Sequence, residues 1–298
     1  MTGGGGPDIL MLAWRAGRGM LLAIALAWLG ALVILWTFQR NLLYMAPQQP
    51  PGAPPDGYQS VRLRTEDGLV LTAWYRPPDP GQPTVILFPG QGASLAWSAD
   101  WSRGFAEAGF GMLLVSFRGF DANPGTPTEQ GLYRDGRAAI AWLAAEGEPR
   151  PVLAGVSLGS GVAAEMAIEA AARTAAWPPA TEPRALILLS PYRSIPAVAA
   201  ARYPLFPVRP LVKDRFDTES KIGAVRLPVL VIHGEDDQLI PFPEGVAVYR
   251  AAPPPKRFVA LPGIGHEYPS LAVLPAVQGF LAETGSRGPG LTPAATQP

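Results

Sequence analysis

The sequence predicts an α/β domain of three layers, in which helices enclose a mostly parallel central sheet. Short apolar runs alternate with helical stretches along the 298-residue chain, and runs that are apolar on both faces are typical of buried parallel strands. Two further segments flank Glu66-Asp67-Gly68, a turn sequence that predicts an antiparallel hairpin. A hairpin followed by alternating strands and helices favours this architecture.

The expected strands are short and mostly apolar. The hairpin strands are predicted at 58–64 and 69–75, and the buried strands at 85–88, 112–117, 152–155, 186–189, 229–232 and 257–260. Between them, Thr126-Pro127-Thr128-Glu129 predicts a helix start, with Thr126 as the N-cap and Pro127 as the first helical residue. An Ala-rich segment predicts another helix at 158–173.

A segment before the domain, 20–38, contains no charged residue and is long enough to cross the ~30 Å hydrocarbon layer of a membrane as a helix. A buried core helix is one alternative, but such helices are seldom apolar on every face. A cleavable signal peptide is another, because Arg15 and Arg18 precede the segment. No small-x-small cleavage pattern follows it, so the sequence favours an uncleaved signal anchor.

Basic residues beside this segment predict its orientation. Arg15 and Arg18 precede it and Arg40 follows it, so the positive-inside rule predicts a cytoplasmic tail at 1–19 and a catalytic domain outside the cytoplasm. We therefore expect a single-pass protein of a bacterial inner membrane, with its domain on the periplasmic side.

Proline-rich and polar segments delimit the domain. Residues 39–57 contain a Pro-rich stretch that predicts an extended linker. The polar segment 285–298 predicts a disordered tail. The domain is therefore expected at 58–284.

Composition excludes several classes of function. The chain contains no Cys and only 2 His, which excludes disulfides, Cys nucleophiles and most zinc sites. The 24 basic residues balance the 24 acidic residues, whereas nucleic-acid-binding proteins carry a basic surface. We therefore expect no nucleic-acid partner, no metal and no cofactor.

The sequence Gly155-Val156-Ser157-Leu158-Gly159 is a Gly-x-Ser-x-Gly motif between a predicted strand and a predicted helix. In this context the motif is typical of a nucleophile elbow, a sharp turn that exposes a serine hydroxyl. A Gly-rich turn with an inert serine is the alternative. The motif makes Ser157 the candidate nucleophile.

A serine nucleophile needs a base, and a carboxylate that orients the base. His266 follows the last predicted strand, at the sheet edge where α/β proteins place their ligands. His233 ends the preceding strand and is expected to be a packed, hydrogen-bonded residue. The acid is expected just after His233, where Glu235, Asp236 and Asp237 are adjacent candidates.

These motifs resemble those of the α/β-hydrolase superfamily, in particular of Bem46 / ABHD13-like serine hydrolases with an N-terminal membrane helix. The resemblance covers about 58–280 and includes the stretches 117–120, 125–135, 190–195 and 213–222. It implies the α/β-hydrolase fold and the chain order nucleophile, acid, base. The family's His-Gly-x-x-Asp and Gly-x-x-His patterns place the acid on Asp237 and the base on His266.

The oxyanion loop departs from the family pattern. Where relatives usually have His-Gly-Asn, this chain has Pro89-Gly90-Gln91. The oxyanion hole needs backbone N–H groups, which Gln91 and Leu158 are expected to supply. Asp135, Asp214 and Asp217 are expected at helix ends or in ion pairs.

The resemblance implies a membrane-anchored serine hydrolase that cleaves an ester or thioester of an acyl substrate through an acyl-enzyme on Ser157. A peptidase or amidase is an alternative within enzymes, and a catalytically silent, membrane-tethered binding or scaffold protein is an alternative outside them. A lid is expected at about 191–228. Its apolar, Pro-rich sequence favours an acyl chain of moderate length.

Overall fold

The computed structural model describes residues 6–148, 150–173, 177 and 181–285. Among these residues, eight strands form one sheet in the order β1-β2-β4-β3-β5-β6-β7-β8. The β1–β2 and β2–β4 pairs are antiparallel, and all other neighbours are parallel. The strands are β1 Gln59–Arg64, β2 Val70–Arg76, β3 Thr84–Phe88, β4 Gly111–Leu114, β5 Val152–Val156, β6 Ala185–Leu189, β7 Val229–Gly234 and β8 Lys256–Leu261.

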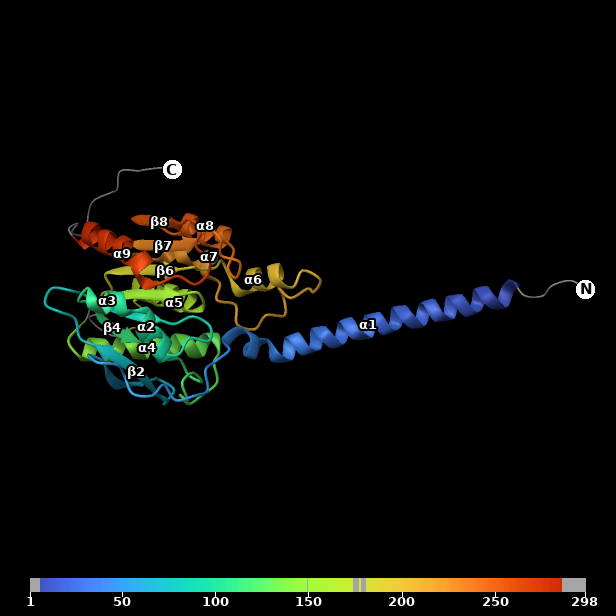
Figure 1. The fold of residues 1–298 in the computed structure, drawn as a ribbon, viewed down its shortest axis with the longest axis horizontal. Coiled ribbons are helices and arrows are strands. Elements are labelled where there is room, and N and C mark those ends of the chain that lie inside the picture. Colours follow the sequence, from blue (N-terminus) through green and yellow to red (C-terminus); the bar gives the residue numbers. More distant parts are fainter. Residues whose placement is uncertain (1–5, 149, 174–176, 178–180, 286–298) are drawn as a thin grey trace, which may run out of the picture.

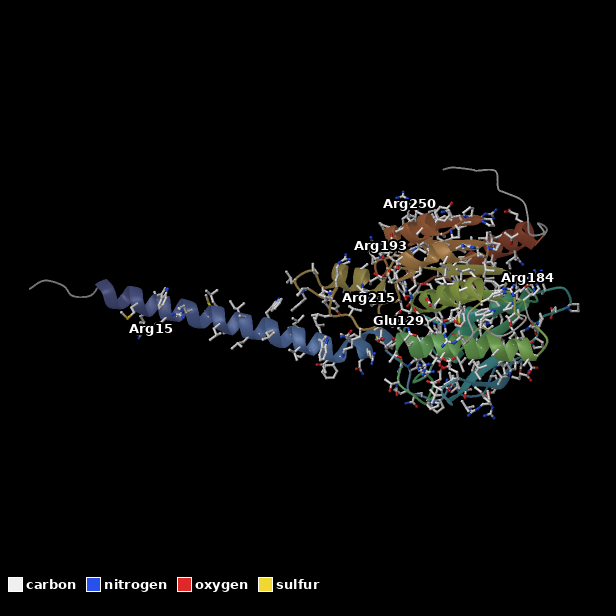
Figure 2. All side chains as sticks on the ribbon, turned by 180° about the vertical axis from the view of Figure 1, so that it is seen from behind. Arg15, Glu129, Arg184, Arg193, Arg215 and Arg250 are labelled. Atoms are coloured by element: carbon white, nitrogen blue, oxygen red, sulfur yellow. The ribbon has the colours of Figure 1, made fainter. Side chains whose placement is uncertain are left out.

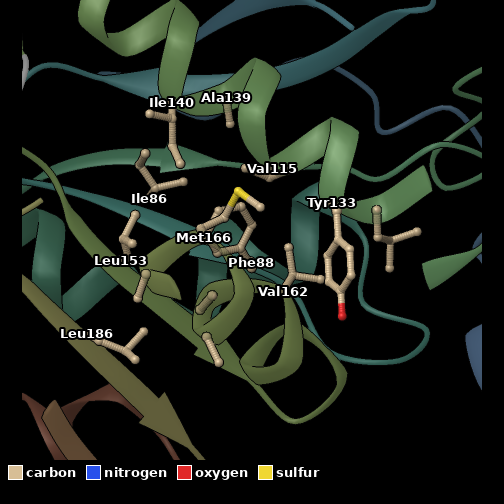
Figure 3. Close-up of a cluster of buried hydrophobic side chains, with 14 of the residues drawn as sticks. Ile86, Phe88, Val115, Tyr133, Ala139, Ile140, Leu153, Val162, Met166 and Leu186 are labelled. Carbon is tan, nitrogen blue, oxygen red and sulfur yellow. The ribbon is translucent and has the colours of Figure 1, made fainter. Parts of the chain in front are cut away.

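Helices cover both faces of this sheet (Figure 1). One face packs against α2 (Leu95–Trp101), α3 (Arg103–Glu107) and α9 (Ser270–Gly285), and the other against α4 (Glu129–Ala145), α5 (Leu158–Ala172) and α8 (Phe242–Ala251). In the central strands, alternate side chains enter the two cores, as the two-residue repeat of a strand requires, whereas β1 buries one face only. Figure 3 shows the second core, where Met166 of α5 packs against the sheet. The predicted fold class is confirmed.

One helix start differs from its prediction. Helix α4 begins at Glu129, and Thr128 rather than Thr126 is its N-cap. The Thr128 hydroxyl accepts a hydrogen bond from the Gly131 N–H at 3.0 Å, which satisfies one of the free N–H groups at the helix start.

The N-terminal helix is longer than the predicted span. Helix α1 runs from Gly6 to Tyr44 and projects away from the domain (Figure 1). Within Met11–Tyr44, the most apolar 18-residue window has a mean hydropathy of 2.4, and none of that window is buried in the protein. The helix is long and apolar enough to cross a membrane. Part of the predicted cytoplasmic tail 1–19 is therefore helical, as is the start of the predicted linker 39–57.

The last turns of α1 are part of the domain, which explains why the helix continues past residue 38. Tyr44 is only 2% exposed and packs in the core beside α4. The Arg40 guanidinium donates to the Asp214 carboxylate at 2.8 Å. Beyond the helix, the carbonyl of Pro47 accepts from the Asp121 N–H at 2.7 Å. The first part of the predicted linker, from Arg40 to Pro47, is thus held against the domain.

The predicted lid segment, 191–228, divides into two parts. Helix α6 (Ile195–Arg202) and the loop after it lie beside α1 (Figure 1). The remainder contains α7 (Thr218–Lys221) and a 3₁₀ turn, Ile222–Ala224. Phe216 and Ile222 are buried in the core, so this second part packs against the domain. The predicted tail 285–298 lies outside the described residues except for Gly285, which ends α9.

Candidate active site

Ser157 lies in the sharp turn between β5 and α5. Its backbone has φ 48° and ψ −116°, a conformation that non-glycine residues rarely adopt. The turn is tight because a Cβ on Gly159 would lie 2.1 Å from the Phe88 carbonyl oxygen, and one on Gly155 would lie 2.3 Å from the Gly159 carbonyl oxygen. The Gly-x-Ser-x-Gly motif therefore forms an elbow that only glycine permits at both flanking positions.

His266 lies between Ser157 and Asp237. Its Nε2 is 3.1 Å from the Ser157 hydroxyl, and its Nδ1 is 2.7 Å from a carboxylate oxygen of Asp237. Ser157 follows β5, Asp237 follows β7 and His266 follows β8, so all three lie beyond the carboxyl ends of the parallel strands. The structure thus brings the three predicted residues together in one hydrogen-bonded chain.

The structure also distinguishes Asp237 from its acidic neighbours. Glu235 and Asp236 are exposed, whereas Asp237 is 3% exposed. Its second carboxylate oxygen accepts from the N–H groups of Leu239 and Ile240, at 2.9 and 2.8 Å. Burial alone would raise the pKa of Asp237, but the hydrogen bonds from the two histidines and from Ile240 outweigh it and hold that pKa below its usual value. The carboxylate is therefore ionised at neutral pH.

His233 is fully buried, as expected of a packed residue. Its Nε2 is 2.8 Å from the Ile240 carbonyl oxygen and 3.4 Å from the Asp237 carboxylate. Because Nε2 meets a carbonyl oxygen, it carries the proton. His233 thus supports the loop that holds Asp237, and none of its contacts among the described residues involves Ser157.

The two predicted oxyanion residues flank Ser157. Leu158 follows Ser157 in the chain. Gly90, which precedes Gln91, approaches Ser157 closely: a Cβ atom added to Gly90 would lie 3.5 Å from the Ser157 Cβ. No hydrogen bond among the described residues uses the backbone N–H of Gln91 or of Leu158. Both groups are thus free to donate to an oxyanion.

The side chain of Gln91 has a position that the sequence did not indicate. Its Nε2 donates to the carbonyl oxygens of Leu42 and Leu43, at 2.5 and 2.9 Å, and the next residue, Gly92, donates its N–H to the Tyr44 carbonyl at 3.1 Å. The last carbonyls of a helix have no partner within it. The loop after β3 therefore caps the C-terminus of α1, and α1 in turn fixes this loop.

We expect Gln91→Ala to lower kcat on a soluble ester about tenfold, with a smaller change in KM. The variant keeps its backbone N–H but loses two hydrogen bonds to α1, each worth about 0.5–1.5 kcal/mol, and the loop loses its position. The measurement is steady-state hydrolysis of p-nitrophenyl butyrate by the full chain. Gln48→Ala is the control, because Gln48 also donates to a backbone carbonyl, that of Ala46, and is not among the residues that line the cavity at Ser157. Equal kcat values in the two variants would contradict a positioning role.

An apolar cavity of about 360 Å³ leads to Ser157. Its walls come from the end of α1, from α6 with the loop after it, and from the segment after Asp237. Most lining side chains are apolar. The walls include Leu32, Leu35, Trp36, Leu42, Leu43, Ile195, Val198, Val208, Leu211 and Leu239. The cavity suits an apolar group attached to the reacting carbonyl.

No family model matches the chain. A protein of Mycobacterium tuberculosis, "Uncharacterized protein Rv2307c", is 36% identical over 278 residues, which cover 89% of this chain and 95% of the relative. A crystal structure of an alpha-beta hydrolase from Vibrio vulnificus has a TM-score of 0.66 at 21% identity, covering 82% of this chain and 92% of the other.

The chain has the fold of the α/β-hydrolases. It shares a family with Rv2307c. A more distant relative, the lysophosphatidylserine lipase ABHD12 of Macaca fascicularis, is 30% identical over 167 residues, which cover 51% of this chain and 40% of that protein. The narrower Bem46 / ABHD13-like assignment stays a prediction.

Proposed function

We propose that this α/β-hydrolase is a membrane-anchored serine hydrolase that cleaves a carboxylic ester or thioester of an acyl chain. The observation that carries the proposal is the hydrogen-bonded chain from Ser157 through His266 to the buried Asp237 carboxylate. The apolar cavity beside Ser157 supports an acyl substrate, and so does the similarity to ABHD12, a lysophosphatidylserine lipase.

The mechanism follows from the positions of these groups. The Ser157 oxygen attacks the substrate carbonyl carbon while His266 Nε2 takes the hydroxyl proton, and Asp237 stabilises the resulting imidazolium. The N–H groups of Gln91 and Leu158 donate to the oxyanion. His266 then gives its proton to the leaving alcohol or thiol, which leaves an acyl-serine. Water, deprotonated by His266, attacks this acyl group, and His266 then returns the proton to the departing Ser157 oxygen, which releases the carboxylic acid and restores the free enzyme.

A fluorophosphonate probe tests this proposal with the full chain in detergent. We expect one phosphonylated residue, located on Ser157 by mass spectrometry, and no labelling of Ser157→Ala. An unlabelled wild-type chain would favour the catalytically silent binding protein. Turnover of p-nitrophenyl butyrate and of the matched anilide then separates an esterase from an amidase.

We further propose that the domain lies outside the cytoplasm, on the periplasmic side of a bacterial inner membrane. Arg15 lies near the far end of α1 (Figure 2), and Arg18 follows it in the same helix. Both support this orientation by the positive-inside rule. We expect alkaline phosphatase fused after Thr284 to be active in cells, because this enzyme folds only outside the cytoplasm. If only a cytoplasmic reporter fused at that position were active, the domain would lie in the cytoplasm and the proposed orientation would be wrong.

A further inference from the structure

The loop after α6 touches α1 far from the domain. The ring of Phe206 stacks on the ring of Trp28, with centroids 5.6 Å apart and 14° between their planes. The Trp28 indole N–H donates to the Leu205 carbonyl at 3.1 Å. Trp28 lies in the middle of the uncharged segment 20–38, and the helix rises ~15 Å between Trp28 and Phe38. A bilayer that holds this segment therefore also surrounds the loop.

The chemistry of this loop fits the hydrocarbon of a bilayer. Residues 203–208 read Tyr-Pro-Leu-Phe-Pro-Val and carry no charge, and Leu205 is 80% exposed. Arg202 and Arg209 flank the tip, where their long side chains can reach the headgroups.

The backbone of the loop is also largely satisfied internally. The Phe206 N–H donates to the Tyr203 carbonyl and the Val208 N–H to the Phe206 carbonyl, at 3.1 and 2.8 Å. The Leu205 carbonyl has the Trp28 indole as its partner. Backbone groups without partners are costly in hydrocarbon, and the two prolines of this loop bring no N–H.

The cavity at Ser157 lies between these same two elements. Leu32, Leu35 and Trp36 of α1 line it on one side, and Val208 with residues of α6 lines it on the other. The walls on the α1 side belong to the segment that enters the membrane. The cavity of about 360 Å³ is near the lower end of the roughly 300–1,000 Å³ of small-molecule sites, which fits one acyl chain better than two.

We propose that the loop 203–208 inserts into the leaflet beside α1, and that the cavity takes the acyl chain of a single-chain ester lipid directly from that leaflet. The substrate identity rests on the proposed hydrolase activity, whereas the insertion of the loop does not. The ester carbonyl of the lipid reaches Ser157 at the domain end of α1, and the polar headgroup of the lipid stays at the membrane surface.

A depth measurement tests the insertion independently of catalysis. The chain contains no Cys, so Leu205→Cys gives one labelling site for a bimane fluorophore. Leu271→Cys is the matched control, because Leu271 is also exposed, at 64%. It belongs to α9, which lies on the side of the domain away from α1 (Figure 1). In phosphatidylcholine nanodiscs with doxyl-labelled lipid, we expect quenching at least threefold stronger at position 205. Equal quenching at the two positions would overturn the insertion.

A kinetic comparison tests the source of the substrate. We expect Leu205→Asp in nanodiscs to lower kcat/KM for bilayer-borne monoolein at least tenfold, because the charged tip leaves the hydrocarbon. Turnover of p-nitrophenyl butyrate, which enters from water, should change less than twofold, and Leu271→Asp should leave both rates unchanged.

The outcomes separate the two proposals. Wild-type monoolein turnover that Leu205→Asp leaves unchanged would overturn entry from the leaflet while the hydrolase stands. A wild-type chain that is unreactive toward the fluorophosphonate would overturn the hydrolase, and the quenching experiment would still decide where the loop lies.

Discussion

Replacing Asp237 by Asn is expected to lower kcat for p-nitrophenyl butyrate by about 10⁴-fold, the size of the effect in the chymotrypsin-type triad. The Asp237 carboxylate accepts the Nδ1–H of His266 at 2.7 Å, which leaves Nε2 unprotonated and able to take the Ser157 proton. An amide can donate to Nδ1 instead and so favour the tautomer that has its proton on Nε2. The base is then lost although the geometry is preserved.

Asp236→Asn is the matched control, because Asp236 is an exposed neighbour of the same charge. We expect its kcat to stay within about twofold of wild type. Steady-state kinetics of both variants, with equal amounts of folded protein verified by circular dichroism, decides the assignment. A large loss in Asp236→Asn together with a small one in Asp237→Asn would place the acid one residue earlier.

The Asp237 variant should also differ in its acid stability. The pKa of Asp237 is below its usual value in the folded chain. Its ionised carboxylate therefore stabilises the fold at pH values above the unfolded-state pKa, and this stabilisation is lost as pH falls toward the folded-state pKa. The Asn variant lacks this contribution to the pH dependence.

The second large effect concerns stability: Arg118→Leu is expected to lower the free energy of unfolding by about 3–5 kcal/mol. Arg118 pairs with Asp135 at 2.7 Å, and the two side chains are 6% and 0% exposed. Its other guanidinium nitrogen pairs with Asp67 at 2.8 Å. Removal of the guanidinium leaves the Asp135 carboxylate buried without a counter-charge. Thermal unfolding of the full chain in detergent measures the loss, which we expect as a fall in Tm of about 10 °C or more.

This loss should depend on pH in a definite direction. Burial raises the pKa of Asp135, and Arg118 opposes that rise. Without Arg118, the folded-state pKa of Asp135 rises further above its unfolded-state pKa. The variant therefore loses stability as pH rises from the unfolded-state pKa to the folded-state pKa. The difference from wild type should therefore be smaller at pH 5 than at pH 8.

Two controls accompany this measurement. Arg103→Leu removes an exposed partner of Asp100 and should cost less than about 1 kcal/mol. Arg118→Leu combined with Asp135→Leu removes both buried charges and should recover part of the loss. If Arg118→Leu proves no more destabilising than Arg103→Leu, the buried pair contributes little.

Features with local signals were predictable from the sequence. The apolar runs predicted six of the eight strands of the described sheet within a few residues, because buried parallel strands need such runs. The turn sequence Glu66-Asp67-Gly68 predicted the other two as a hairpin. The Gly-x-Ser-x-Gly motif identified Ser157, and the position after the last predicted strand identified His266, two of the residues that meet beyond the carboxyl ends of the strands. Among the three adjacent acids, only the family pattern pointed to Asp237, and its burial was visible only in the fold.

The course of α1 was not predictable in the same way. Residues 39–44 follow an uncharged segment and precede prolines, so local signals suggest the beginning of a linker. The helix continues because the domain offers partners that are distant in the chain: Asp214 for Arg40, and the Gln91 side chain for the last carbonyls. Interactions over such sequence separations leave no periodicity in the sequence.

The attachment of α1 to the loop after β3 has a consequence for how this family can change over generations. An ordinary anchor drifts freely, because any apolar segment of suitable length serves. Here the helix end is constrained by the loop beside Ser157 and by Asp214. Substitutions near residue 40 are therefore viable mainly when their partners in the domain change with them. We therefore expect α1 and the domain to change as one unit, because replacing α1 by another apolar helix would remove the contacts of Arg40 with Asp214 and of the helix end with Gln91.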